Sequence, residues 1–554
     1  MRPYLFLTLL LLCPLASRAE ALDPMLPGPL TVESGEYKFP ATLDPQVLTT
    51  MPTELWAKAF WPRTMRGPRP IVFFLHGNHP TCASPGKEPG THSDSNCDYT
   101  YTGTCPAGMV PTPNHEGFSY AASHLASQGY VVVSINANRG ITCGDAVRGD
   151  EALNLARGRL ILRHIEKWQA WSREGGAPAS LGTGPDAFLK HVDLTRIGLV
   201  GHSRGGEGVR AAHFLSNDPK APWRKILPDA RVRGIFEIGA TDGQTDLTLN
   251  AENVAWNQLI PMCDGDVPDF DGRGPFERMW RLKAESTPAP KSLFLVWGAN
   301  HNFFNTEWQS NDAARCSGQT RIHGSGPWSE AQQKIGKASI TAFFRANLAA
   351  EGETPAANIF DPAVPLPKSL TAITRIDRDS IPTFDRRYFF PLETFDGLTP
   401  ARPEARGEGV KFTKDLATPN RARIEWKDGA PMEQKFFQVK WEWPYAPRSL
   451  SELNSLGFRL ALDAPPTYGS TPNADFQIAL IDEADQISAV LPASRYAQVQ
   501  SPLTALKMFQ TVSIPLRDFA LRTDEISRIR GVRFLFPNGQ GTIYLTGIHF
   551  TRKL

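Results

Sequence analysis

The chain has 554 residues, of which 41% are hydrophobic and 21% are charged, and its formal net charge is +2. This length exceeds what one hydrophobic core usually supports, so we expect more than one domain. The balanced charge, without blocks of one sign, argues against nucleic acid or a charged membrane surface as the main partner.

The first residues are typical of a secretory signal peptide. Arg2 precedes the apolar run Leu5–Leu15, and the small-residue pattern Ala19-Glu20-Ala21 follows it. Residues 1–21 are therefore predicted to be removed from a protein that is secreted, either extracellular or periplasmic. The apolar run is too short to span a bilayer, and no later stretch approaches the roughly 20 apolar residues that a spanning helix needs.

Six cysteines remain after the signal peptide: Cys82, Cys97, Cys105, Cys143, Cys263 and Cys316. An even number in an exported chain predicts disulfide bonds, although the sequence does not choose among the possible pairings. The irregular spacing, without a Cys-x-x-Cys pair, argues against a zinc site.

Residues 22–350 alternate short apolar runs with helical patterns. The predicted strands are Glu54–Phe60, Ile71–Leu75, Tyr130–Asn136, Arg196–Val200, Val232–Ile238, Gln258–Met262 and Ser292–Trp297. Helical periodicity is visible in Leu153–Trp168 and Lys334–Leu348. Consecutive apolar positions are typical of strands buried on both faces, so we expect an α/β domain with a mainly parallel sheet covered by helices on both sides.

The pattern changes after residue 350. Residues 351–394 hold six prolines among polar residues, which predicts an exposed connector: Pro355, Pro362, Pro365, Pro367, Pro382 and Pro391. Residues 395–554 contain strand-like runs without long helical patterns between them, as in Phe436–Trp443 and Thr542–Phe550. We expect an all-β sandwich of jelly-roll-like form there, and a part ending near Ala350 that folds alone.

The most informative motif is Gly201-His202-Ser203-Arg204-Gly205, which has the pattern G-x-S-x-G. It follows a predicted strand and precedes a helical segment. A serine at such a sharp turn exposes its hydroxyl at the N-terminus of a helix, which is the arrangement of a nucleophile. The backbone N–H of Arg204 would then face the developing oxyanion.

The histidine that acts as base should follow a later strand. Gly298-Ala299-Asn300-His301 comes directly after the predicted strand Ser292–Trp297, so His301 is the predicted base. His213 lies in the helix after the nucleophile and is directed away, whereas His323 is a rival within a glycine-rich segment.

Three aspartates are candidates for the acid that orients this histidine. Asp264 and Asp266 both follow the predicted strand Gln258–Met262, and Asp242 follows the strand before it. The loop also contains Asp269 and Asp271, and closely spaced carboxylates can bind calcium. Their spacing does not fit an EF-hand loop. A solvated acidic loop is the simpler interpretation.

Four segments carry a resemblance to a known superfamily: HGN at 76–78, GHSRGG at 201–206, CDGD at 263–266 and GANH at 298–301. In this order, on successive strands, they resemble the α/β-hydrolase superfamily, and within it secreted esterases of the dienelactone hydrolase, chlorophyllase and polyester hydrolase branch. The resemblance covers about residues 30–350. It implies ester hydrolysis without a cofactor or metal.

The resemblance also assigns roles to individual residues. CDGD is similar to the G-x-x-D ending of hydrolase strands, with Cys263 at the glycine position, which selects Asp266 as the triad acid. HGN is similar to the oxyanion loop of lipases and esterases and points to the backbone N–H of Asn78 as second donor. His76 and His202 are interpreted as groups that pack or tether loops.

The predicted function is that of a serine esterase acting on a small or polymeric ester through an acyl-enzyme on Ser203. A peptidase or amidase would use the same groups. A third alternative is a carbohydrate- or surface-binding protein with an inactive hydrolase domain, because the C-terminal region is similar to carbohydrate-binding jelly rolls. Four aromatic residues there could stack on sugars, although a core role is favoured: Trp426, Trp441, Trp443 and Tyr445.

Overall fold

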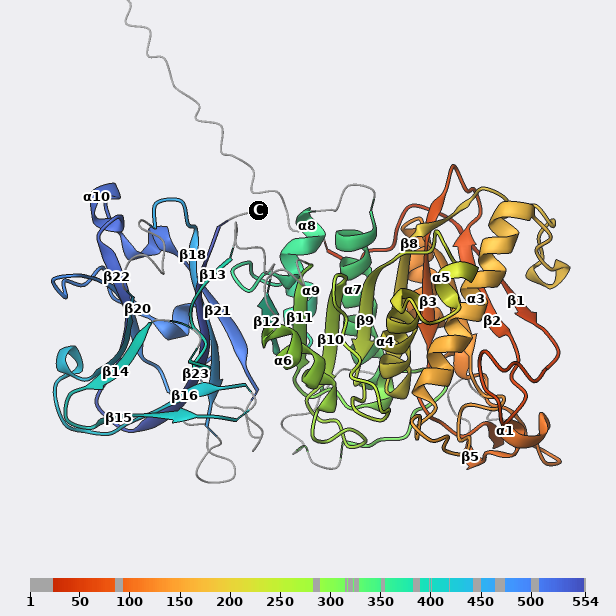
Figure 1. Cartoon of the computed structure of the whole chain (residues 1–554), viewed down its shortest axis with the longest axis horizontal. Coiled ribbons are helices and arrows are strands. Elements are labelled where there is room, and N and C mark those ends of the chain that lie inside the picture. The colour runs from red at the N-terminus through yellow and green to blue at the C-terminus, as the bar shows by residue number, and fades with distance from the viewer. Residues whose placement is uncertain are drawn as a thin grey trace, which may run out of the picture.

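The computed structural model shows two parts side by side, one built on a large mixed sheet with helices and one built on two antiparallel sheets (Figure 1). The structure describes residues 23–84, 93–281, 289–313, 316, 322, 328–349, 354–381, 389–397, 399, 401–417, 419–441, 450–463, 474–499 and 508–552. The predicted signal peptide lies outside these residues.

The large sheet has nine strands in the order β1-β2-β7-β3-β8-β9-β10-β11-β12. The six strands from β7 to β11 in this order are parallel, whereas β1, β2 and β12 are antiparallel to their neighbours. The bounds are β1 Val32–Lys38, β2 Trp56–Pro62, β3 Arg69–Leu75, β7 Val131–Asn136, β8 Val192–His202, β9 Val232–Ile238, β10 Ala255–Pro261, β11 Lys291–Val296 and β12 Ile376–Ile381. The predicted parallel sheet is thus present, with antiparallel strands added at both edges.

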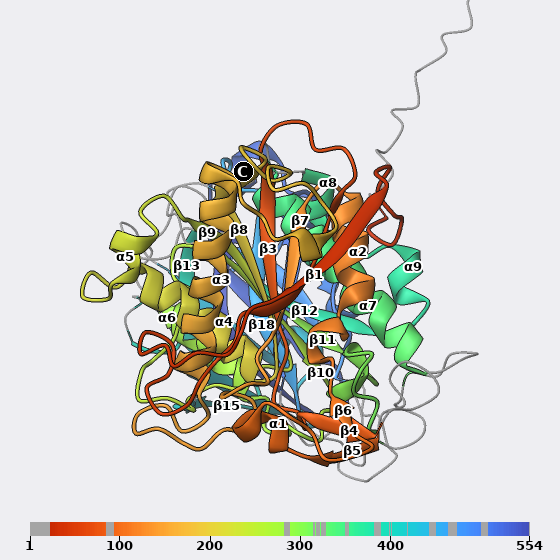
Figure 2. The same cartoon turned by 90° about the vertical axis from the view of Figure 1, so that its right-hand side faces the viewer.

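Helices cover both faces of this sheet (Figure 2). α3 (Asn154–Glu174) and α4 (Arg204–Asn217) pack together on one face, and α2 (Ser119–Ser127) and α7 (Trp328–Leu348) pack together on the other. The apolar residues of each strand divide accordingly between two cores, one on each side of the sheet. This division explains why the central strands are apolar at consecutive positions.

Shorter elements connect the strands. The helices among them are α1 Asp98–Thr102, α5 Trp223–Ile226, α6 Gly274–Arg281, α8 Thr354–Ala357 and α9 Lys368–Thr371, and β4 Cys82–Ser84, β5 Ser93–Asn96 and β6 Val110–Pro111 form a small sheet.

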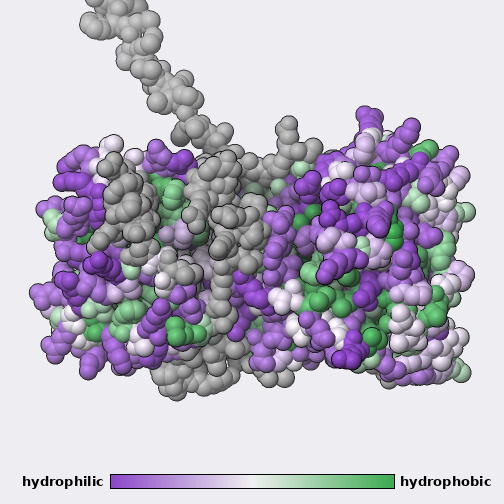
Figure 3. All heavy atoms as spheres, viewed as in Figure 1, coloured by the Kyte–Doolittle hydropathy of each residue, from purple (hydrophilic) through white to green (hydrophobic). Residues whose placement is uncertain are grey.

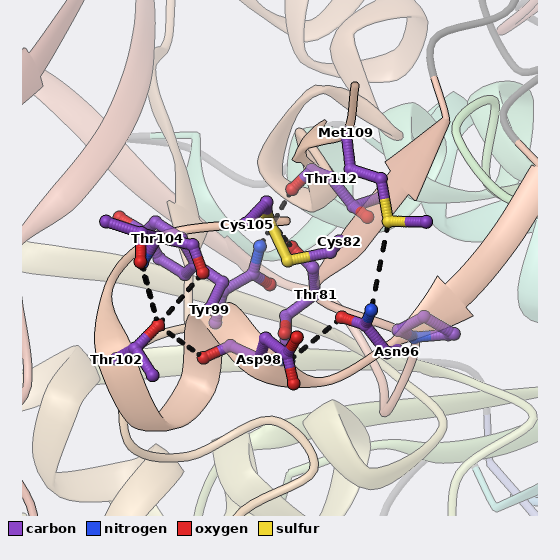
Figure 4. The surroundings of a disulfide bond; sticks show 12 residues. Thr81, Cys82, Asn96, Asp98, Tyr99, Thr102, Thr104, Cys105, Met109 and Thr112 are labelled. Carbon is purple, nitrogen blue, oxygen red and sulfur yellow. Dashed lines mark hydrogen bonds between the residues drawn. A yellow bond between two sulfur atoms is a disulfide. The ribbon is translucent and has the colours of Figure 1, made fainter. Parts of the chain in front are cut away.

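The six cysteines form three disulfides, as the sequence predicts: Cys82–Cys105, Cys97–Cys143 and Cys263–Cys316. The first two hold the long insertion after β3. Figure 4 shows the first of them, where Thr81 and Thr112 lie close to the bonded sulfur atoms. The third anchors the loop that follows β10.

The second part consists of two antiparallel sheets that enclose one apolar core. One sheet has the order β15-β16-β23-β18-β21, with β13 paired to β23, and the other has the order β14-β17-β22-β19-β20. The bounds are β13 Phe389–Glu393, β14 Arg402–Arg406, β15 Val410–Asp415, β16 Arg421–Trp426, β17 Phe436–Lys440, β18 Ser455–Leu462, β19 Gln477–Asp482, β20 Leu491–Pro492, β21 Gln510–Pro515, β22 Ile529–Leu535 and β23 Gly541–Thr551, with the short helix α10 at Thr523–Ile526. Trp426 and Trp441 belong to this core, whereas Trp443 and Tyr445 lie outside the described residues.

The segment 351–394 does not act only as a connector, because its described residues join both parts. β12 pairs with β11 as the ninth strand of the large sheet, and β13 pairs with β23 of the second part. The proline-based prediction overlooked β12 because its sequence, Ile-Asp-Arg-Asp-Ser-Ile, has no apolar run.

A buried ion cluster joins the two parts. Arg459 of β18 is fully buried and donates to both carboxylate oxygens of Asp379 on β12, at 2.6–3.0 Å, and to Glu277 on α6, at 2.7–2.9 Å. The guanidinium also lies about 5 Å from the ring centres of Phe276 and Trp280. The second part therefore packs on the edge of the large sheet through complementary buried charges.

The outer surface seen in Figure 3 is mostly hydrophilic, with smaller hydrophobic groups between the polar residues. None of the helices in the described chain is both long enough and apolar enough to cross a membrane.

Candidate active site

The candidate residues gather at the carboxyl ends of the parallel strands. Along the chain, β3 is followed by β7 and later by β8. In the sheet, β3 lies between these two strands. The connections therefore leave in opposite directions from the ends of β3 and β8, and open α/β sheets generally bind their ligands at such a switch point. Asn78 follows β3 and Ser203 follows β8 at this position.

Ser203 occupies a strained turn between β8 and α4. Its backbone has φ 56° and ψ −129°, a conformation that non-glycine residues rarely adopt. Its N–H donates to the carbonyl of Ile238 at 2.9 Å, which fixes the turn against the end of β9. Strain of this kind persists where the surroundings enforce it, and it presents the side chain at the start of a helix.

Glycines around this turn are required by close contacts. A Cβ on Gly77 would lie 2.6 Å from the Cβ of Ser203, and a Cβ on Gly205 would lie 2.5 Å from the carbonyl oxygen of Leu75. Both contacts follow from the pairing of β3 with β8, in which Leu75 is opposite Gly201. The glycine at 77 therefore allows the loop after β3 to lie directly against Ser203.

His301 is fully buried and its Nδ1 donates to Oδ2 of Asp264 at 2.8 Å. The other oxygen of Asp264 accepts from the backbone N–H groups of Asp266 and Val267, at 3.0 and 2.6 Å. A Cβ on Gly239 would lie 2.9 Å from His301 Nδ1, so the pair lies against the end of β9, as Ser203 does. The hydrogen bond that the motif assigned to Asp266 is thus made by Asp264.

Asp266 lies on the opposite nitrogen of the same ring. Its Oδ2 is 3.4 Å from His301 Nε2, and its side chain is 62% exposed, against 1% for Asp264. Burial by itself lowers the pKa of His301, but the charge and hydrogen bond of Asp264, together with the charge of Asp266, outweigh burial and raise that pKa to about 9.

Three further contacts position the histidine loop. Asp312 accepts from the N–H of His301 at 3.1 Å and from the N–H of Gly265 at 2.7 Å, so it joins this loop to the acidic loop. The disulfide Cys263–Cys316 links the same two segments. His202 Nε2 donates to the carbonyl of His301 at 3.0 Å, which confirms the predicted tethering role of His202.

His76 orients the predicted oxyanion donor. The N–H of Ala137 donates to His76 Nε2 at 2.9 Å, so the ring proton is on Nδ1, which donates to the carbonyl of Gly77 at 2.8 Å. Because a trans peptide directs N–H and C=O oppositely, this bond turns the N–H of Asn78 away from His76. Within the described residues, the N–H of Asn78 makes no hydrogen bond, and Arg204 is the first residue of α4, where backbone N–H groups have no intrahelical acceptor.

The rival residues lie elsewhere. His213 Nε2 bonds to the carbonyl of Glu252, and Asp242 forms ion pairs with Arg210 and Arg278. His323 lies outside the described residues. Asp312 was missed by sequence reasoning, since it follows no predicted strand and only the folded loop brings it beside His301.

A group of possible metal ligands lies apart from these residues. Donor atoms of Glu36, His115 and Glu116 lie within 4.8 Å of one another. They already have protein partners: Lys58 pairs with Glu116 at 2.7 Å, and Asn136 donates to His115 Nδ1, which leaves the ring proton on Nε2 facing Glu36. This arrangement is that of a hydrogen-bonded ion network.

A cavity of about 10 Å³ beside Asp264, lined in part by Gly239, Gln258 and Phe270, has room for about one water and not for a substrate. Comparison with known proteins gave no matching family model and no matching curated protein.

Proposed function

We propose that the chain is a secreted serine esterase with the α/β-hydrolase fold. The observation that carries the proposal is the buried pair of His301 and Asp264 at 2.8 Å, placed with the strained Ser203 against the same end of β9. In this proposal Ser203 is the nucleophile, His301 the base and Asp264 the acid that holds the imidazole, in place of Asp266.

The proposed reaction is acyl transfer to water. His301 Nε2 takes the proton of the Ser203 hydroxyl as its oxygen attacks the ester carbonyl. The N–H groups of Asn78 and Arg204 stabilise the oxyanion, and the alcohol leaves with the proton from His301. Water then attacks the acyl-enzyme through the same base, which releases the acid and restores Ser203.

Labelling by a fluorophosphonate tests this proposal. The purified protein should be labelled, and peptide mass spectrometry should locate the label on Ser203. Ser203→Ala should prevent labelling and lower kcat on para-nitrophenyl esters by about 10⁴- to 10⁶-fold, with an unchanged unfolding midpoint. A Ser203→Ala protein that keeps more than a tenth of the activity would contradict the assignment. Hydrolysis of matched anilides as fast as the esters would favour an amidase.

A further inference from the structure

An arginine without a partner lies next to the nucleophile. Arg204 follows Ser203 directly and is partly buried, yet in the described part of the chain its guanidinium makes no hydrogen bond and no ion pair. Burial lowers the pKa of Arg204, while the charges of Asp266 and Glu207 oppose this effect. Taking a guanidinium out of water without a partner is costly, so the residue is suited to receive a ligand.

The two carboxylates whose charges act on Arg204, Glu207 and Asp266, make no ion pair with it. Glu207 accepts from the N–H groups of Gly243 and Gln244, both at 3.0 Å, and is fully buried. Asp266 is exposed to solvent, and no ion pair joins it to Arg204. The guanidinium therefore keeps its donors available.

A second arginine, Arg157, adds positive charge beside Asn78. Arg157 on α3 is fully buried, and its Nη1 and Nη2 donate to the carbonyl of Ala152 at 2.8 Å and to Oδ1 of Asn78 at 3.3 Å. Among the described residues, its Nε has no hydrogen-bond partner and no carboxylate bonds to its guanidinium. Burial lowers the pKa of Arg157 to about 9, and the positive charge of Arg204 acts in the same direction.

Two other fully buried arginines show that this lack of partners is local. Arg210 is paired with Glu237 and Asp242, and Arg459 is paired with Asp379 and Glu277. Arg210 and Arg459 are thus each neutralised by two carboxylates, whereas no carboxylate among the described residues bonds to Arg157 or Arg204. The N-terminus of α4 adds further positive potential at Ser203.

We propose that Arg204 binds a carboxylate that the substrate carries beside its scissile ester. The positive charge of the buried Arg157 adds to the attraction for this carboxylate. The substrate class is then carboxylate-bearing esters. The inference rests on the proposed esterase function and adds a specificity-determining residue to it. Planar guanidinium groups suit carboxylates because they donate two parallel hydrogen bonds.

Matched substrates test the proposal. On the acyl side, mono-para-nitrophenyl succinate is compared with para-nitrophenyl butyrate, and on the alcohol side acetoxybenzoate is compared with its methyl ester. The readout is the ratio of kcat/KM for the charged ester to that for the neutral ester. The full-length protein should prefer the charged ester in at least one pair, and rising ionic strength should lower this ratio.

Arg204→Gln keeps the backbone N–H and should lower that ratio at least about tenfold, since bonds to charged groups are strong. Arg204→Lys should keep part of the preference, and Asp266→Asn should increase it by removing a nearby negative charge. Arg173→Gln is the matched control, because this exposed arginine pairs with Asp229 at the far end of α3. In Arg173→Gln, the ratio of kcat/KM for the charged ester to that for the neutral ester should equal the ratio in the unchanged protein.

Protection from fluorophosphonate labelling is a second measurement, and it does not depend on substrate turnover. Succinate should slow fluorophosphonate labelling of the unchanged protein and have less effect on Arg204→Gln. An unchanged ratio and unchanged protection in Arg204→Gln, with neutral esters still hydrolysed, would overturn the inference while leaving the esterase proposal intact. Absence of both labelling and hydrolysis in the unchanged protein would overturn both.

Discussion

Two carboxylates flank the ring of His301, and they differ in what they can do to it. Asp264 is buried and is held by two backbone N–H groups while it accepts from Nδ1. Asp266 is exposed near Nε2, the nitrogen that accepts the Ser203 proton in the proposed reaction. Only the first is positioned to fix the tautomer and stabilise the imidazolium.

Asp264→Asn is therefore expected to lower kcat by about 10⁴-fold, because the ring loses the acceptor that sets its orientation. Asp266→Asn should keep most of kcat when both variants are measured at pH 9.5 on a para-nitrophenyl ester. The reverse ranking would restore the motif-based choice of Asp266.

The sequence predicted an acid in the loop after β10, and the carboxylate that bonds to His301 comes from that loop, but the sequence could not select the residue. Both aspartates follow the same strand, two positions apart, and either could face the ring after a small change in the turn. The choice is made by the turn itself, in which Oδ1 of Asp264 accepts the N–H groups of Asp266 and Val267. Sequence spacing carries no information on that local hydrogen bonding.

The pH dependence of kcat/KM should reflect the negative charges of the carboxylates around His301. The proposed base, His301, must be neutral to accept a proton, and its pKa is raised to about 9, so kcat/KM should rise with pH up to about 9. Removing the charge in Asp266→Asn lowers this pKa, which should move the rising limb to lower pH. A profile that levels off near pH 6.5, or one that Asp266→Asn leaves in place, would contradict this account.

At the scale of elements, the pairing of β3 with β8 sets the distance between the loop after β3, which is the proposed oxyanion loop, and Ser203, the proposed nucleophile. Gly77→Ala would place a Cβ 2.6 Å from the Cβ of Ser203, closer than atoms tolerate. We expect at least about a hundredfold loss of kcat/KM, since either the turn or the Asn78 donor must shift.

The control for this change is Gly184→Ala, because a Cβ at Gly184 meets no atom within 4 Å. Both proteins are compared by ester hydrolysis and by urea unfolding. Nearly full activity in Gly77→Ala would show that the loop after β3 can move freely and does not supply a fixed donor.

The central strands could be predicted because they are buried on both faces and are therefore apolar at consecutive positions. The edge strands β1 and β12 could not be predicted from the sequence. β1 is Val-Glu-Ser-Gly-Glu-Tyr-Lys, with one buried residue, and β12 places the charged Asp379 inside the molecule, where Arg459 pairs with it. Their polar sequences resemble loops, and only neighbouring strands and a buried cation make them part of the sheet.

On the scale of the whole molecule, the contact between the two parts is a structural joint rather than a flexible tether. Asp379 lies on the ninth strand of the large sheet, Glu277 on α6 and Arg459 on a strand of the β-sandwich. A chain ending near Ala350 loses both β12 and this arginine, which leaves the apolar strand β11 as an open edge. These contacts argue against the expectation that such a truncated chain folds alone.

Arg459→Ala tests this joint in the full chain. The change leaves two carboxylates buried without a counter-charge, so we expect the free energy of unfolding to fall by about 3–5 kcal/mol in urea denaturation. Arg495→Ala is the control, since Arg495 is 58% exposed and lies 3.6 Å from Asp518, and it should change stability by less than about 1 kcal/mol. Truncation at residue 350 should give a protein that does not unfold cooperatively. A truncated chain with a sharp unfolding transition and full activity on soluble esters would show instead that the large sheet is stable without β12, and that the β-sandwich is an independent attachment.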